Sequence, residues 1–198
     1  MLRALRRPEA AIYKSLSMIR EILVWPHPTL KKQASKVTVV DDAVRTLVKD
    51  LFETMYAADG VGLAAPQVGV LKNVIVLDTR PRQPDSRPIA MINPEIVATE
   101  GTTVYTEGCL SVPGEAEDVK RAARVTVRYL DEEGREQSLE ADALLAIAVQ
   151  HEIDHLLGKV FVEYLSPLKR ELIKKRMKRL QADREAGGAQ PRVADSGR

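Results

Sequence analysis

The segment HEIDH, at residues 151 to 155, brings two histidines and a glutamate close together within an apolar stretch of helical length. Residues four apart lie on the same face of a helix, so the His151 and His155 imidazoles can reach one metal ion. Glu152 lies beside them and can handle the protons of a water molecule at that ion. The alternative is a pair of structural histidines, but neither is needed to complete the apolar stripe of the helix. The pattern therefore predicts a metal site with a neighbouring general base.

Two histidines leave a catalytic zinc-type site one protein ligand short. The single cysteine of the chain, Cys109, lies in EGCLSVPG at residues 107 to 114, where glycine and proline bracket a short extended piece. A downstream carboxylate, Glu163, is the alternative ligand. It falls in KVFVEYL, residues 159 to 165, where we expect a strand and a solvated or paired glutamate. We therefore predict a Cys-His-His site with an open fourth position.

A thiolate beside two imidazoles suits zinc, iron(II), nickel or cobalt, so the ligands alone do not name the metal. Two other functions remain open at this point. A metallopeptidase of the HExxH type would need Glu163 or another carboxylate in place of Cys109. A non-enzymatic, ribosome-binding protein would hold a structural metal, although such sites usually close with four protein ligands.

Helices must position these residues. The spacing of apolar residues predicts one helix over about 42–58 and a second over 143–157, which carries HEIDH. Asp142 is the expected N-cap of the second helix, and Gly158 is its expected C-terminal cap. A third helix is expected over 167–182.

Extended stretches come before the last two helices. They are expected at residues 19–26, 73–77, 89–99 (interrupted at Asn93-Pro94) and 124–130. The last one alternates apolar and polar residues and is followed by the turn DEEG and a return stretch from residue 136, which predicts a hairpin. Runs of strands followed by helices predict an α+β fold, with antiparallel strands packed around a central HExxH helix.

The chain has 198 residues, 44% apolar residues and a net charge of only +2, which fits one domain of ordinary size. We expect a metallohydrolase domain at 18–166, a basic helix at 167–182 and a disordered tail at 183–198. Residues 1–17 are an arginine-rich appendage that we expect to be disordered, with an organelle transit peptide as the less favoured alternative. The lone cysteine excludes an internal disulfide, and no apolar run is long enough to cross a membrane. These features favour a cytoplasmic protein.

Three motifs together resemble the signature motifs of peptide deformylases. They are GVGLAAPQ at residues 60–67, EGCLS at 107–111 and QHEIDHLLG at 150–158, in the order and at the spacing of that family. The resemblance extends from about Met18 to Leu180. It implies a peptide-deformylase-like fold and removal of the formyl group from N-formylmethionyl peptides.

The resemblance also implies roles for the residues of the site. Cys109, His151 and His155 would bind one divalent metal ion, iron(II) by resemblance, with water in the fourth position. Metal-bound hydroxide would attack the formyl carbon, while Glu152 acts first as general base and then as general acid.

Further roles concern the groups around the metal. The Gln67 side-chain amide and the Leu110 backbone N–H would stabilise the oxyanion. The Gly62 backbone would contact the substrate chain, with Gly60 as a second glycine of the motif. Glu107 would pair with Arg121 and brace the metal loop.

The methionine side chain of a substrate needs an apolar pocket. Three apolar residues precede His151 by seven, four and three positions and share its helix face: Leu144, Ile147 and Ala148. By resemblance Val61 adds to this pocket. Ordinary core packing explains these four residues equally well.

One departure from the family concerns the peptide beyond its methionine. Some members carry an arginine after the cysteine motif, where this chain has Ala116. The neighbouring carboxylates make an acidic rim, which consists of Glu115, Glu117 and Asp118. Peptide preference beyond methionine is therefore open.

Residues 169–180, KRELIKKRMKRL, carry seven basic side chains and one acid beside a narrow apolar stripe. A solvated face is one explanation. The other is contact with ribosomal RNA, since bacterial deformylases of similar layout use this helix to dock on the ribosome. We expect neither DNA nor a membrane as a partner, and we favour a bacterial source over an organelle.

Overall fold

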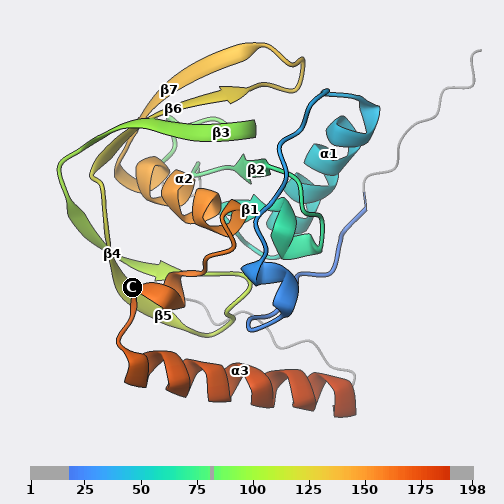
Figure 1. Ribbon diagram of the computed structural model, residues 1–198, viewed down its shortest axis with the longest axis vertical. Coiled ribbons are helices and arrows are strands. Elements are labelled where there is room, and N and C mark those ends of the chain that lie inside the picture. The colour runs from blue at the N-terminus through green and yellow to red at the C-terminus, as the bar shows by residue number, and fades with distance from the viewer. Residues whose placement is uncertain (1–17, 81–82, 188–198) are drawn as a thin grey trace, which may run out of the picture.

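The computed structural model describes residues 18–80 and 83–187 (Figure 1). The predicted appendage at 1–17 and the end of the predicted tail, from residue 188, lie outside the described residues. One α-helix precedes the described strands and two follow them, and the described strands form no parallel βαβ unit. The predicted α+β class with antiparallel strands is confirmed.

Most of the described strands form one antiparallel sheet in the order β1-β2-β3-β6-β7. These strands are β1 (Gly62–Ala64), β2 (Val74–Leu77), β3 (Ile89–Glu100), β6 (Arg124–Leu130) and β7 (Glu136–Asp142). The predicted hairpin is confirmed, because β6 and β7 pair from Arg124 with Asp142 to Leu130 with Glu136. The short edge strand β1 brings the first motif to this sheet.

Strand β3 continues through the interruption that the sequence predicted at Asn93-Pro94. Its register against β6 shifts between Ile92 and Glu95, and Asn93 adopts a positive φ of 53°. The Asn93 side chain bonds both the N–H and the C=O of Val37. Pro94 lacks a donor, and this irregularity absorbs it without ending the strand.

A separate two-stranded hairpin, which the sequence did not predict as strands, carries the second motif. It pairs β4 (Thr103–Gly108) with β5 (Ala116–Arg121). The turn between the two strands contains Cys109. The metal-ligand candidate is therefore held by a paired hairpin and not by an isolated extended segment.

The described chain holds three α-helices, α1 (Asp42–Ala57), α2 (Ala143–Leu156) and α3 (Pro167–Gly187). Helix α2 has buried residues on almost every side and contacts β1, β2, β6 and β7. Gly158 follows α2 with a positive φ of 74°, as expected for a C-terminal cap. The Asp142 side chain makes no capping hydrogen bond, so that predicted contact is absent.

Figure 1 shows α3 lying along the base of the molecule, beside the β4–β5 hairpin and apart from the five-stranded sheet. Its apolar stripe is anchored by Ile173 and Met177, which pack with Trp25 and Phe161 in one buried cluster. The helix continues to Gly187, so residues 183–187 are helical and not part of a disordered tail.

Two predicted strands are wrong. Residues 19–26 form no strand, because the segment bonds two different loops in turn: Leu23 N–H donates to Gln67 and Trp25 N–H to Ser111. The KVFVEYL segment forms the 3-10 helix η3 (Phe161–Tyr164). Residues 160 to 162 are all buried, and Phe161 packs in one cluster with Ile173 and Met177 of α3.

No helix within the described residues is both long enough and apolar enough to cross a membrane.

Candidate metal centre

The three predicted metal ligands converge in space. The ligand atoms of Cys109, His151 and His155 all lie within 4.8 Å of one another, and Sγ of Cys109 lies 3.2 Å from Nε2 of His155. Both histidines come from successive turns of α2, and Cys109 follows β4 directly. Among the described residues no other group of His, Cys, Asp or Glu side chains meets this spacing. Glu163, the alternative ligand, is exposed on η3 and has no place in the cluster.

Glu107 connects the cysteine hairpin to the first histidine. One of its oxygens lies 2.8 Å from Nδ1 of His151, and both accept hydrogen bonds from Arg121, at 2.7 and 2.9 Å. A carboxylate only accepts, so it favours the tautomer with a proton on Nδ1 and a free Nε2 toward the cluster. Burial opposes ionisation of Glu107, but the bonds from Arg121 and His151 outweigh it and lower its pKa.

Sequence reasoning missed two residues that extend this network. The Asp154 carboxylate pairs with Arg121, and the Tyr164 hydroxyl donates to the same carboxylate oxygen at 2.9 Å. The Arg121 guanidinium also lies over the Tyr164 ring, 4.8 Å from its centre. Burial and the Asp154 charge raise the pKa of Tyr164 to about 12, so its hydroxyl stays protonated. The one available signal was a second acid, Asp154, inside an apolar helix.

Glu152 lies on α2 between the two histidines and is 5% exposed. Burial raises its pKa to about 7, against the lowering effect of His151. Its Oε2 atom is buried without a hydrogen-bond partner among the described residues. Such a carboxyl group can both take up and release a proton near neutral pH.

Gln67 is buried in η2 (Ala65–Val68), and two contacts fix its amide orientation. Its Oε1 accepts from Ala64 N–H at 2.8 Å, so its Nε2 must point the other way. There Nε2 lies 3.1 Å from Oγ of Ser111 and 3.6 Å from Sγ of Cys109. Gln67 therefore caps a turn with its oxygen and directs its N–H donors toward the cysteine.

Comparisons that cover most of the chain identify its relatives. Residues 19–171 match the family model described as polypeptide deformylase. Peptide deformylase 2 of Xanthomonas campestris pv. campestris is 52% identical over 81% of this chain and 95% of that protein. The crystal structure of a peptide deformylase from Legionella pneumophila superposes with a TM-score of 0.79, at 42% identity over 88% of this chain and 100% of that chain.

The chain belongs to the polypeptide deformylase family. It is therefore a hydrolase that acts on an amide bond, as its relatives are. A further structure, of peptide deformylase from Ehrlichia chaffeensis in complex with actinonin, superposes with a TM-score of 0.79 at 40% identity, over 82% of this chain and 98% of that chain.

The residues present in this deformylase fit the metal on which the family depends. Soft and borderline ligands lie in one cluster: the half-buried Cys109 thiol and two buried imidazoles. Burial disfavours charge on His151, but Cys109 and Glu107 outweigh it and raise the pKa of His151 well above its usual value. Cys109 and Glu107 thus favour a positive charge near His151, which a divalent cation supplies.

Two glycines of the first motif make close approaches to the site. A Cβ atom at Gly60 would lie 2.8 Å from a methyl carbon of Leu110, and one at Gly62 would overlap the Glu152 carboxylate. Val61 lies between them, and its C=O accepts from Asp78 N–H. This stretch therefore lies directly against Glu152 and the loop after Cys109.

The predicted pocket residues of α2 divide into two kinds. Ala148 belongs to the core cluster beneath the sheet. Ile147 is buried and Leu144 half-buried, yet neither is a member of the apolar clusters among the described residues. Ala148 therefore packs in the core, and all three residues stay predicted pocket residues.

The acidic rim is already engaged within the chain. Its partners lie on α3 and β4: Glu115 pairs with Arg176, Glu117 with Lys169, and Asp118 accepts from the Thr106 hydroxyl. Ala116 lies opposite Gly108 where the hairpin opens. The rim thus ties α3 to the β4–β5 hairpin and neutralises part of its basic face.

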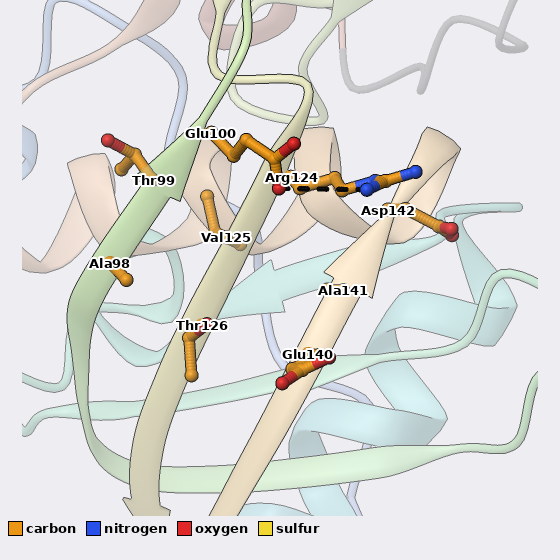
Figure 2. Close-up of a pocket in the computed structure, with 9 residues that line it drawn as sticks. All are labelled: Ala98, Thr99, Glu100, Arg124, Val125, Thr126, Glu140, Ala141 and Asp142. Atoms are coloured by element: carbon orange, nitrogen blue, oxygen red, sulfur yellow. Dashed lines mark ion pairs between the residues drawn. The ribbon is translucent and has the colours of Figure 1, made fainter.

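An open depression elsewhere, over the ends of β3, β6 and β7, contains none of these residues (Figure 2). Arg124 lies across it, with Glu100 at 3.6 Å as its ion-pair partner. Both side chains of this pair are largely exposed, and the lining includes no histidine or cysteine. This depression lacks the buried, convergent groups that a hydrolytic site needs.

Proposed function

We propose that this enzyme removes the formyl group from the N-terminal formylmethionine of nascent polypeptides, with one divalent metal ion held by Cys109, His151 and His155. The observation that carries the proposal is the convergence of these three ligand atoms beside the buried Glu152. Membership of a family that acts on N-formylmethionyl peptides supports the same substrate class.

When bound, the cation supplies Lewis acidity, which lowers the pKa of water and polarises a carbonyl group. We propose iron(II) as the native metal, by resemblance to the family, with zinc, nickel or cobalt as possible substitutes. The one-thiolate, two-imidazole donor set accepts each of these ions.

Glu152 is proposed to move the proton. It takes a proton from the attacking water and returns it to the departing amine, so that the amide bond breaks with a neutral amine as the leaving group. Its raised pKa of about 7 in the metal-free protein supports this role, since both protonation states are accessible near neutral pH.

Gln67 and Leu110 are proposed to stabilise the charge that develops on the formyl oxygen. The Gln67 amide is held with its N–H donors toward Cys109, which supports a donor role without reorganisation. The Leu110 backbone N–H follows Cys109 directly in the chain and is the second proposed donor.

The substrate is proposed to lie along the first motif, from Gly60 to Gly62, which lies directly against Leu110 and Glu152. Its methionine side chain is proposed to occupy an apolar pocket near Val61, Leu144 and Ile147. Glu107 and Arg121 are proposed to hold His151 in orientation.

The decisive experiment is anaerobic release of formate from formyl-Met-Ala-Ser by the iron(II)-loaded protein, with Glu152→Gln as the comparison. We expect formate from the wild type and a large loss in the variant. A folded, metal-loaded wild type that releases no formate would sink the proposal.

A second variant separates this proposal from a metallopeptidase with a carboxylate ligand. Cys109→Ala should abolish metal binding by the deformylase site, whereas a site built on Glu163 would retain its metal. The exposure of Glu163 argues against that alternative.

We also propose that α3 docks the enzyme on the ribosome. Lys169 and Arg176 are engaged by the acidic rim, which leaves Lys175 and Lys178 as exposed cations on the helix. Ribosome cosedimentation should fall steeply with salt and weaken in a Lys175→Glu, Lys178→Glu variant. We propose the cytoplasm of a bacterial cell as the place of action, and the bacterial sources of the relatives support the bacterial part of this proposal.

A further inference from the structure

Tyr164 lies outside all three signature motifs, on η3 between α2 and α3. It nevertheless contacts the network behind the metal cluster in two ways. Its hydroxyl donates to Oδ2 of Asp154 at 2.9 Å, and its ring faces the Arg121 guanidinium at 4.8 Å. Both contacts bear on the same arginine, because Asp154 is itself the ion-pair partner of Arg121.

These contacts hold the Arg121 side chain on two sides. Its side chain is 5% exposed, and its nitrogens are divided between Glu107 on one side and Asp154 on the other. Removal of either carboxylate would leave a buried guanidinium N–H without its acceptor, which favours rotation of the whole group. Glu107 would then lose its bidentate partner.

The loss of the Arg121 bond to Glu107 would then disturb His151, a candidate metal ligand. Glu107 orients His151 through the 2.8 Å contact with Nδ1. A ligand imidazole that is already held in the right orientation loses less rotational freedom when it binds a cation. Mutation of a residue that hydrogen-bonds to a metal ligand therefore commonly changes metal affinity about 10–100-fold. The chain of contacts runs from Tyr164 through Asp154, Arg121 and Glu107 to His151.

We propose that Asp154 and Tyr164 are positioning residues for the metal centre: they fix Arg121, so that Glu107 holds His151 ready to bind the cation. The inference rests on the proposed function only in taking His151 as a metal ligand. Tyr164 thereby links η3, the segment before α3, to the orientation of His151 in the metal cluster.

The experiment measures the dissociation constant for zinc, by competition with a chelator, in the full-length protein. Asp154→Asn should weaken zinc binding about tenfold. Tyr164→Phe keeps the ring over Arg121 and should weaken zinc binding about threefold, because Tyr164 is one contact farther from His151 than Asp154 is. Tyr164→Leu, which also removes the ring, should weaken binding more than Tyr164→Phe.

The chain offers a matched control. The Tyr56 hydroxyl donates to Asp78 at 2.9 Å, and Asp78 in turn pairs with Arg80, so the same trio of groups occurs without a hydrogen bond to Glu107 or to the metal-ligand candidates. Tyr56→Phe should leave zinc affinity unchanged. Thermal unfolding of each metal-free variant then reports the purely structural cost of losing a hydroxyl.

Unchanged zinc affinity in Tyr164→Phe and Tyr164→Leu, with or without a loss of stability, would assign these contacts to packing alone and overturn the inference. If Asp154→Asn does not fold, the two Tyr164 variants decide the question. Formate release by the wild type is measured in parallel. A wild type that binds zinc but releases no formate would sink the proposed function, while the order of zinc affinities would still test the positioning role.

Discussion

Gly62 of β1 and Glu152 of α2 face each other so closely that no further carbon atom fits between them. A Cβ atom at position 62 would lie 2.9 Å from Cδ of Glu152. Real Cβ contacts of that length essentially do not occur, and Glu152 is buried on its other sides. The close packing of α2 on β1 therefore depends on glycine at this position.

We predict that Gly62→Ala displaces the Glu152 carboxylate and lowers kcat/KM for a formylated peptide about 100-fold, since a misplacement of about 1 Å costs that much. The variant should still fold and bind its metal. Gly108→Ala is the control, because its added methyl group finds only a backbone oxygen at 3.8 Å. Full activity in Gly62→Ala would show that Glu152 tolerates displacement.

Glu152→Gln should stabilise the metal-free protein at high pH. The folded-state pKa of Glu152, about 7, lies above its ordinary value of 4.5. The protonated form thus contributes stability below about pH 4.5, and this contribution is lost as the pH rises through about 7. Ionised Glu152 costs roughly 2–3 kcal/mol at about pH 8, which the neutral glutamine avoids.

Urea unfolding of both metal-free proteins checks this pH dependence. The variant should be the more stable protein at about pH 8, and the difference should disappear at about pH 4. Equal stability at both pH values would mean that the carboxylate is solvated in the folded protein.

Gln67→Glu should lower kcat about 10²–10³-fold, because it replaces the N–H donors directed at Cys109 with acceptors. The fold should persist, since the new carboxylate can still accept from Ala64 N–H. Ser111→Ala removes only the acceptor that the amide contacts and should cost much less. Steady-state kinetics at equal metal content compares the two variants.

Asp78→Asn should weaken the protein at neutral pH through the network that Asp78 forms with Tyr56 and Arg80. Hydrogen bonds from Arg80 chiefly hold the pKa of buried Asp78 at about 2, below its ordinary 3.8. The ionised form therefore contributes stability above about pH 4, and this is lost as the pH falls toward 2. Because Arg80 is half exposed, we expect only about 1–2 kcal/mol.

Unfolding free energies measured from about pH 7 down to 2 test this expectation. The gap between the wild type and Asp78→Asn should close between about pH 4 and 2. If the difference in unfolding free energy stays constant over this range, the loss of stability comes from packing and not from charge.

The sequence by itself determined the features that depend on local spacing. The four-residue separation of His151 and His155 requires only a helix to place both imidazoles on one face, and the helix formed where its apolar pattern predicted it. The alternation at 124–130 likewise predicted a strand and its hairpin. Each of these depends on neighbours within one element.

Tertiary structure decided which elements meet. KVFVEYL has strand-forming residues, but the segment forms a 3-10 helix. Phe161 and its neighbours pack there in one cluster with Ile173 and Met177 of α3. That turn is what carries Tyr164 to Asp154. No local pattern encodes this contact, or the approach of Gly62 to Glu152, because both depend on packing between separate elements.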